Sequence, residues 1–378
     1  MKSISFSRKF AFRLILAAIA ACLLYGVVYG FRADISIITG ILNDVENGMS
    51  YTEIELAYAV YKVVTAAMAP VVAIVILKKS NRFVLLGGVI SLLAGLFVMS
   101  FASTLPLLIL GLGVLVGVGC AALSFGIIFG IVSPLLGEKS AVILSTLFTI
   151  ASLCFSVILS PMMQITNNFL GYPVMMLMLS VVIVCTLPLI FILGSSKNEE
   201  AVKKEKESLS LVETAKSLFR RKEVYILILF VFMIGLLGGL QNHFYSGLLA
   251  LDIPVAGASV MFSALKLVTA AASLILTILV LKVKRIFSVT GLVVLLVGAL
   301  ECVIVFMPTE SFEMLSSIVV VTVVFAAVYP LQTLIVRRRY APVLVGSLMC
   351  FLGLFENLGS ALNGIIGGIC YDVFGDFT

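Results

Sequence analysis

Eleven long apolar runs dominate the chain, and each is long enough to cross a lipid bilayer as a helix. A bilayer core of about 30 Å needs about 20 apolar residues at a helical rise of about 1.5 Å per residue. With 62% hydrophobic and 12% charged residues, the composition excludes an ordinary soluble globule. Runs rich in Leu, Ile, Val, Ala and Phe favour helices over the alternating strands of a membrane barrel, so the sequence predicts an all-α polytopic membrane protein. The runs cover 12–41, 54–77, 84–103, 106–131, 141–164, 171–194, 224–250, 257–281, 287–307, 313–336 and 343–370.

Basic residues gather in alternate connections between these runs. Of the 25 Lys and Arg residues, 22 lie in the N-terminal segment or in every second loop. Because cytoplasmic loops of membrane proteins carry the excess of Lys and Arg, this pattern places the N-terminus in the cytoplasm. The net charge of +6 therefore reflects membrane orientation rather than nucleic-acid binding. Short outer loops and the lack of any Asn-x-Ser/Thr sequon favour a bacterial inner membrane.

Two of the three remaining basic residues belong to an internal repeat. The stretch KVVTAA that begins at Lys62 returns 204 residues later (266 − 62) as KLVTAA, which begins at Lys266. Across 62–78, eight of seventeen positions are identical to those of 266–282. A charge in the middle of a membrane is costly and marks a functional site by default. Two such charges at equivalent places in two half-proteins predict a symmetric transport site.

A polar, charge-dense segment at 195–222 separates the first six runs from the last five. We expect it to be a cytoplasmic linker with a short amphipathic helix between an N-terminal half, 1–194, and a C-terminal half, 223–378.

Local signals mark helix starts and close packing. Ser50 and Glu53 form a capping-box pattern that predicts the start of the second span. Glycines four residues apart in span four, such as Gly113 and Gly117, let neighbouring helices approach closely.

The two halves and the basic central loop resemble the major facilitator superfamily over nearly the whole chain. The resemblance implies two pseudo-symmetric six-helix bundles that work by alternating access. It also implies a twelfth helix, so about twenty residues are expected to be missing after Thr378. Short strings further resemble the monocarboxylate and oxalate/formate carriers of this superfamily: Tyr25-Gly26-Val27-Val28-Tyr29-Gly30-Phe31, Gly48-Met49-Ser50-Tyr51-Thr52-Glu53-Ile54 and Glu213-Thr214-Ala215-Lys216.

One superfamily motif is altered in this chain. The loop between spans two and three usually carries Gly-x-x-x-Asp-Arg-x-Gly, whose acid is thought to lock the inward gate. Here Ala73 takes the glycine position and Leu77 takes the acid position. The expected cytoplasmic gate residues are therefore the basic ones that remain, together with those of the equivalent loop: Lys78, Lys79, Arg82, Lys282 and Arg285.

The resemblance places spans two and eight between the halves, opposite spans eleven and five. Span eleven offers the carboxylate of Glu356 to Lys62, whereas the matching positions of span five, Ser152 and Leu153, offer Lys266 only a hydroxyl. An ammonium left unpaired in a low dielectric loses its proton or binds an anion.

We therefore expect Lys266 to bind the substrate carboxylate, with Thr269 as a hydrogen-bond donor one turn away. Lys62, beside Thr65, would pair with Glu356 as a gate or bind a second anionic group. The alternative is that the two lysines simply bridge helices.

Other polar residues at depth lie in spans one and seven. Arg32 suits bidentate capture of a carboxylate, and its alternative is to snorkel outward or to pair with Asp34. Asn242 and His243 follow a glycine-rich stretch of span seven. His243, the only histidine, would couple transport to protons or serve as a hydrogen-bonded packing residue.

The leading function is a secondary carrier for a small organic anion, a mono- or dicarboxylate, by proton symport or anion exchange. Its expected partners are this substrate, the lipid bilayer and protons, with no nucleic acid, and the chain is expected to act as a monomer. An efflux carrier for lipophilic or cationic compounds and a transporter-like sensor without turnover are the alternatives. No phosphate-binding loop, metal cluster or nucleophile–base set is present, so neither an enzyme nor a cofactor or metal is expected.

Overall fold

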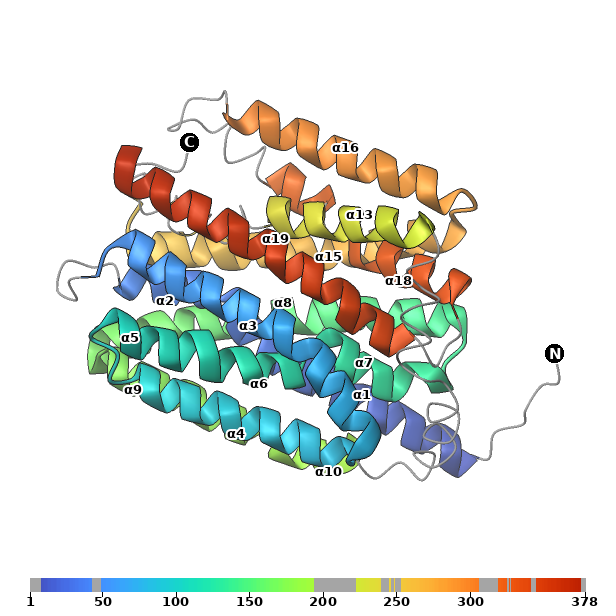
Figure 1. The fold of residues 1–378 in the computed structure, drawn as a ribbon, viewed down its shortest axis with the longest axis horizontal. Coiled ribbons are helices and arrows are strands. Elements are labelled where there is room, and N and C mark those ends of the chain that lie inside the picture. Colours follow the sequence, from blue (N-terminus) through green and yellow to red (C-terminus); the bar gives the residue numbers. More distant parts are fainter. Residues whose placement is uncertain are drawn as a thin grey trace.

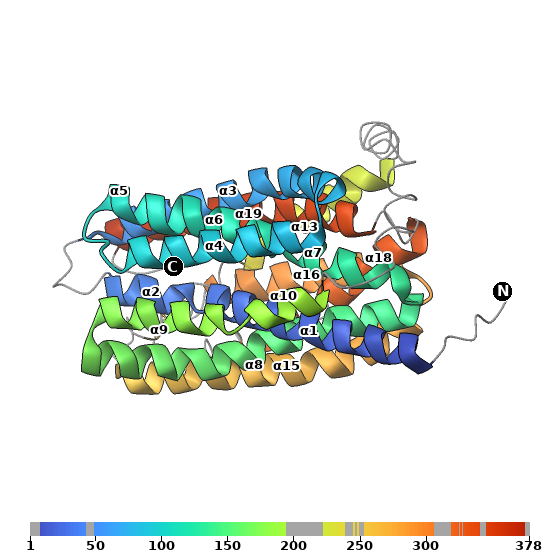
Figure 2. The ribbon, with the colours of Figure 1, turned by 90° about the horizontal axis from the view of Figure 1, so that it is seen from below.

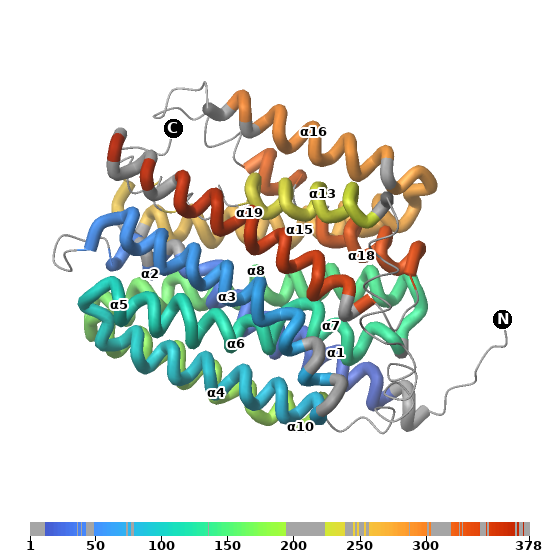
Figure 3. The backbone as a smooth tube through the Cα atoms, viewed as in Figure 1, coloured from blue at the N-terminus to red at the C-terminus, as the bar shows by residue number. Residues whose placement is uncertain are grey.

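The computed structural model describes residues 8–42, 49–193, 222–238, 245, 248, 253–305, 319–324, 326, 328–340 and 345–374, which are coloured in Figure 1. Figure 3 shows the course of the backbone as a tube in the same view. Of the expected linker 195–222, residues 195–221 with the expected amphipathic helix lie outside these residues, whereas Lys222 already begins a helix. The regular elements among the described residues are all helices, which confirms the all-α expectation (Figure 1).

The helices follow the apolar runs closely. Among the described residues, nine helices are long and apolar enough to cross a membrane, and two shorter apolar helices occupy Val224–Gly238 and Ser288–Leu300. In the first half the elements are α1 Arg8–Ala33, α2 Ile35–Leu42, α3 Tyr51–Lys78, α4 Asn81–Met99, α5 Leu105–Leu108, the π-helix η1 Ile109–Val116, α6 Gly117–Ala122, α7 Phe125–Val132, η2 Ser133–Leu135, α8 Glu138–Leu170, α9 Tyr172–Val184 and α10 Leu187–Leu193. In the second half they are α13 Lys222–Gly238, α15 Val255–Lys282, α16 Ile286–Val305, α18 Val328–Arg339 and α19 Val345–Phe374.

The repeat seen in the sequence is also a repeat of helix boundaries. α3 begins at Tyr51 and ends at Lys78, and α15 begins and ends 204 residues later, at Val255 and Lys282. The start of α3 has the expected capping box: Ser50 Oγ accepts from the Glu53 amide at 3.2 Å, while the Glu53 carboxylate accepts from the Ser50 amide at 3.0 Å.

Two long helix pairs join the halves. α3 packs along α19, and α8 packs along α15. Figure 2 shows these pairs on opposite sides of the molecule, with α1 between them. We call these two contacts, α3 with α19 and α8 with α15, the seams between the halves. Span one therefore faces both seams.

Span one is broken where it passes between the seams. α1 ends at Ala33, Asp34 forms a turn, and α2 begins at Ile35. The turn keeps its backbone hydrogen-bonded, because the Asp34 amide donates to Phe31 and the Asp34 carbonyl accepts from Ile37, each at 3.0 Å. Discontinuous helices of this kind place polar groups at depth in transporters.

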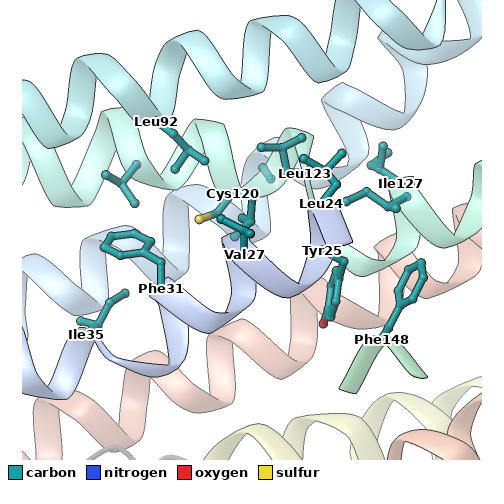
Figure 4. Close-up of a cluster of buried hydrophobic side chains, with 14 of the residues drawn as sticks. Leu24, Tyr25, Val27, Phe31, Ile35, Leu92, Cys120, Leu123, Ile127 and Phe148 are labelled. Carbon is teal, nitrogen blue, oxygen red and sulfur yellow. The ribbon is translucent and has the colours of Figure 1, made fainter. Parts of the chain in front are cut away.

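The first half has a dense apolar core around α1. Leu24 and Phe31 are buried beside Leu92 of α4 and Leu123, which follows α6 (Figure 4). This packing fixes one face of α1, so its other face, which carries Arg32, is held toward the second half.

Glycines in span four allow close packing against two neighbouring helices, α3 and α4. Gly113 and Gly117 face α3, where added Cβ atoms would lie 2.9 Å and 3.0 Å from side-chain carbons of Val60 and Val64. This confirms the close approach expected from their spacing. On another face, a Cβ on Gly119 would lie 2.8 Å from the Gly88 carbonyl oxygen of α4.

Replacement of Gly119 by Ala is expected to destabilise the protein. The new methyl group meets backbone atoms that cannot turn aside, and overpacking of this kind costs about 1–3 kcal/mol. Gly87→Ala is the matched control, since nothing lies within 4 Å of its Cβ position. Thermal unfolding in detergent should show a lower midpoint for Gly119→Ala and an unchanged or higher one for Gly87→Ala. Equal midpoints would contradict this packing.

Candidate anion-binding site between the halves

A cavity of about 200 Å³ lies between the two halves at the level of the duplicated lysines. Helices from both halves contribute to its wall. Its lining residues are Tyr25, Tyr29, Arg32, Ala33, Tyr58, Lys62, Thr149, Ser152, Leu153, Ile234, Gly235, Gly238, Thr269, Thr322, Ala326, Tyr329, Glu356 and Ser360. Arg32, Lys62 and Glu356 are the charged members of this set, so the formal charge of the lining is +1.

Arg32 is held by contacts to both halves. Its guanidinium carbon lies 4.9 Å from the centre of the Tyr29 ring and 6.0 Å from that of Tyr61. Its Nη2 donates to Asn357 Oδ1 of α19 at 2.8 Å. The expected alternative of a pair with Asp34 is wrong, because the carboxylate of Asp34 accepts from a different cation, Lys266.

Lys62 faces aromatic rings rather than a carboxylate. Its Nζ lies 4.9 Å from the centre of the Tyr58 ring and 5.9 Å from that of Tyr61. Tyr61 thus lies within reach of both cations of the cavity. Ring faces attract cations, but less strongly than a carboxylate does.

Glu356 does not pair with Lys62, contrary to one expected arrangement. Its Oε1 accepts a hydrogen bond of 2.8 Å from the hydroxyl of Tyr329. Within the described part of the chain, no ion pair joins Glu356 to Lys62 or Arg32. The two cations of the cavity therefore lack a carboxylate in contact.

The expectation that Lys266 meets only hydroxyls is also wrong. Lys266 forms an ion pair with Asp34 at the break in span one, and it also donates to the hydroxyl of Ser156. Asp34 Oδ1 accepts further hydrogen bonds from Ser156 and Ser160 of α8. The ring of Phe262 covers the ammonium, with its centre 3.6 Å from Nζ. Lys266 is neutralised inside the protein and does not line the cavity.

Helix packing relates the surroundings of the two lysines. A Cβ on Gly30 of α1 would lie 3.1 Å from the carbonyl oxygen of Ser152, and one on Gly235 of α13 would overlap the carbonyl oxygen of Glu356. Ser152 and Glu356 are separated by 204 residues, as the two lysines are. α1 against α8 is therefore the counterpart of α13 against α19.

This relation shows what the second half lacks. Asp34 lies four residues after Gly30, whereas the third and fourth residues after Gly235 are Gly238 and Gly239. Ser360, which lines the cavity, is the counterpart of Ser156 by the offset of 204. By these sequence equivalences, the half that faces Lys62 has a serine, Ser360, in the place of Ser156 and glycine in the place of Asp34.

Of the other residues expected to bind substrate, one lines the cavity and another contributes to helix packing. Thr269 lines the cavity, as expected of a substrate-binding residue, although its hydroxyl donates to the Leu265 carbonyl at 2.8 Å. Thr65 donates to the Gly117 carbonyl at 3.2 Å and is not part of the cavity wall. Asn242 and His243 lie outside the described residues.

At the basic end of the molecule, where the Lys- and Arg-rich loops lie, the halves are linked by residues outside the expected gate set. Arg338 pairs with Glu138 at 3.2 Å and Arg337 donates to the Leu136 carbonyl, and both contacts join the two halves. Arg338 also donates to the Val283 carbonyl at 3.0 Å within the second half. The run at 337–339 could be recognised in the sequence only as an orientation signal.

The expected gate loops make no such link in the described part of the chain. Arg82 donates to the Phe191 carbonyl at 3.4 Å within its own half, and Lys79 lies 5.9 Å from the Phe83 ring centre. Lys282 and Arg285 are exposed, and the side chain of Lys78 lies outside the described residues.

Substitutions of the two lysines should have opposite consequences. Lys266→Met leaves Asp34 buried and unpaired, and breaking a buried ion pair costs about 3–5 kcal/mol. Adding Asp34→Asn removes the stranded charge and should recover much of the loss. Lys62→Met is the matched control and should change stability by less than about 1 kcal/mol, because no carboxylate is stranded. Thermal midpoints in detergent test this order. A Lys62→Met protein as unstable as Lys266→Met would contradict the assignment.

Comparisons with known proteins agree with the architecture. The sequence profile of the Major Facilitator Superfamily matches residues 14–364. The crystal structure of the human organic anion transporter MFSD10 (TETRAN) is similar, with a TM-score of 0.64 and 15% sequence identity over 95% of this chain and 93% of that one. No curated protein sequence matches. The likeness at 15% identity shows a shared fold, and the profile covers both halves: this chain belongs to the Major Facilitator Superfamily.

Proposed function

We propose that this chain is a secondary active carrier for a small organic anion with one carboxylate, similar to the monocarboxylate and oxalate/formate carriers. It works as a monomer by alternating access, with its basic end in the cytoplasm. The observation that carries the proposal is Lys62, a cation that lines the cavity between the halves with no carboxylate in contact. The human protein named above is titled an organic anion transporter, but at 15% identity its substrate carries no weight here.

Charge balance selects the class of substrate. Arg32 and Lys62 contribute two positive charges to the cavity wall, and Glu356 contributes one negative charge. Like charges around one cavity repel, and the repulsion is strong where water is scarce. A single carboxylate brings the sum to zero, whereas a cation would increase the imbalance. This argues against the alternative of an efflux carrier for cationic compounds.

The surroundings of Lys266 indicate where that carboxylate binds. Asp34, a part of the protein, accepts hydrogen bonds from both Lys266 and the hydroxyl of Ser156. At the related place, Lys62 and Ser360 line the cavity beside Gly238. We place the substrate carboxylate there, so that it takes the role beside Lys62 that Asp34 has beside Lys266.

The rest of the cavity suits the organic part of such a substrate. Four tyrosines, Tyr25, Tyr29, Tyr58 and Tyr329, provide both ring faces and hydroxyl groups. Aromatic side chains bury apolar surface while their hydroxyls satisfy polar groups. Arg32, which donates one hydrogen bond to Asn357, has further N–H groups that can donate to the anion.

Transport assays on proteoliposomes test the proposal directly. Counterflow of labelled monocarboxylates, dicarboxylates and hydrophobic cations should be seen only for the carboxylates, with monocarboxylates preferred. Lys62→Gln and Arg32→Gln should each reduce monocarboxylate counterflow at least tenfold, equivalent to about 1.4 kcal/mol of lost binding. Lys284→Gln, an exposed lysine of the basic end, is the matched control and should be unaffected.

Three outcomes would count against this function. Full counterflow by Lys62→Gln would remove Lys62 from the site, and saturable uptake of cations would favour the efflux carrier. Carboxylate binding without any flux would favour the transporter-like sensor.

Glu356 gives a second test of charge balance. Glu356→Gln raises the formal charge of the lining from +1 to +2, so the preferred substrate should shift from mono- to dicarboxylates. The ratio of the two counterflow rates measures this shift. Tyr329→Phe is the control, because it removes the hydrogen-bond donor to Glu356 and keeps the charge. An unchanged ratio in Glu356→Gln would contradict the charge argument.

A further inference from the structure

A buried carboxylate on α3 has no role in the cavity. Glu55 is 4% exposed, and its Oε2 has no hydrogen-bond partner among the described residues. It lies against α19, where a Cβ on Gly364 would be 2.9 Å from Oε2. Glycine at this position leaves the space that the carboxyl group occupies.

The surroundings of Glu55 offer little to compensate a negative charge. The charged group that acts on it is Lys62, seven residues further along α3. The facing turns of α19 carry Ser360 and Asn363, and Glu356 lies eight residues before Gly364. The other contacting elements near this end, α2, α5 and η1, contain no titratable side chain, and Cys120 of α6 lies deeper. An isolated carboxylate in such a place is stable only as the neutral acid.

The position of Glu55 connects it to opening. It lies four residues after Tyr51, where α3 begins at the end opposite the basic one. Moving from the cavity toward that end, the α3–α19 seam contains Tyr58 hydrogen-bonded to Ser360, and then Glu55 against Gly364. This seam lies between the cavity and the outer side in the proposed orientation. Opening to the outside must separate these turns, because the halves move against each other in alternating access.

We propose that Glu55 is a pH-sensitive gate residue and that its protonation from the outer side is required for the outer seam to close. The inference rests on the proposed function, because opening and closing of this seam are steps of alternating access. With the seam open, water solvates the ionised carboxylate. Closing the seam removes that water, so the carboxylate must first take a proton from the outer solution. Low outer pH therefore favours closure, and high outer pH favours the open seam.

Glu55→Gln tests this gate, because the amide has nearly the shape of the neutral acid and cannot release a proton. In proteoliposomes, wild-type counterflow of a monocarboxylate should slow about tenfold as the outer pH rises from about 5, near the ordinary carboxyl pKa, to about 8. Glu55→Gln should keep the faster, low-pH rate across this range.

Glu53→Gln is the matched control. It is the same substitution two residues away on the same helix, and glutamine also satisfies a capping box. Its counterflow should respond to pH as that of the wild type does. Wild-type pH dependence of counterflow in Glu55→Gln would overturn the proposal.

A distance measurement keeps the inference testable if carboxylate transport itself fails. Spin labels at Leu56 of α3 and Ile369 of α19, two exposed positions, report the separation of the seam in a variant without native cysteines. The population with the longer distance should grow as the pH rises from 5 to 8, and Glu55→Gln should abolish the change. A distribution that does not respond to pH would refute Glu55 as the gate, whatever the substrate is. A response with no carboxylate flux would refute only the proposed substrate.

Discussion

A charge inside a bilayer needs a compensating partner, and this requirement organises the centre of the molecule. Lys266 meets it within the protein, through Asp34 at the break in span one and two serine hydroxyls of α8. Lys62 does not meet it in the same way, because tyrosine rings are its neighbours and no carboxylate is in contact. Lys266 is therefore compensated within the interface between the halves, whereas the positive charge of Lys62 faces the cavity without a carboxylate in contact.

Because span one is broken at Asp34, a short segment of it contacts helices of both seams. Arg32 reaches Asn357 on α19, and two residues later Asp34 reaches Lys266 on α15. These contacts tie the first half to the second on both sides of the cavity. The α3–α19 and α8–α15 pairs lie on opposite sides of the molecule, so opening of either seam must alter the contacts of span one. Through these contacts of span one, a substrate bound in the cavity would influence whether a seam opens or closes.

The two ends of the interface between the halves differ in chemistry. At the basic end, Arg337 and Arg338 bind the carbonyl and carboxylate groups of the segment 136–138. At the other end, the seam brings Glu55 against Gly364 with no ionic partner in contact. Ion pairs exposed to water at one end depend weakly on pH near neutrality, whereas a buried carboxyl group depends on it strongly. The asymmetry would make the outer seam, and not the basic end, sensitive to pH.

The sequence alone determined the apolar spans and the equivalent places of the two lysines on their helices, because bilayer thickness and the repeat of 204 residues leave few alternatives. It also determined the capping box at Ser50 and the close packing at Gly113 and Gly117, since these depend on local spacing. Only the tertiary structure decided which lysine is neutralised. That depends on Asp34, which lies 232 residues from Lys266 along the chain and reaches it through a helix break that no local pattern marked. Which side chains pair across an interface depends on how whole helices lie relative to each other. The separation of two residues along the chain says little about that placement.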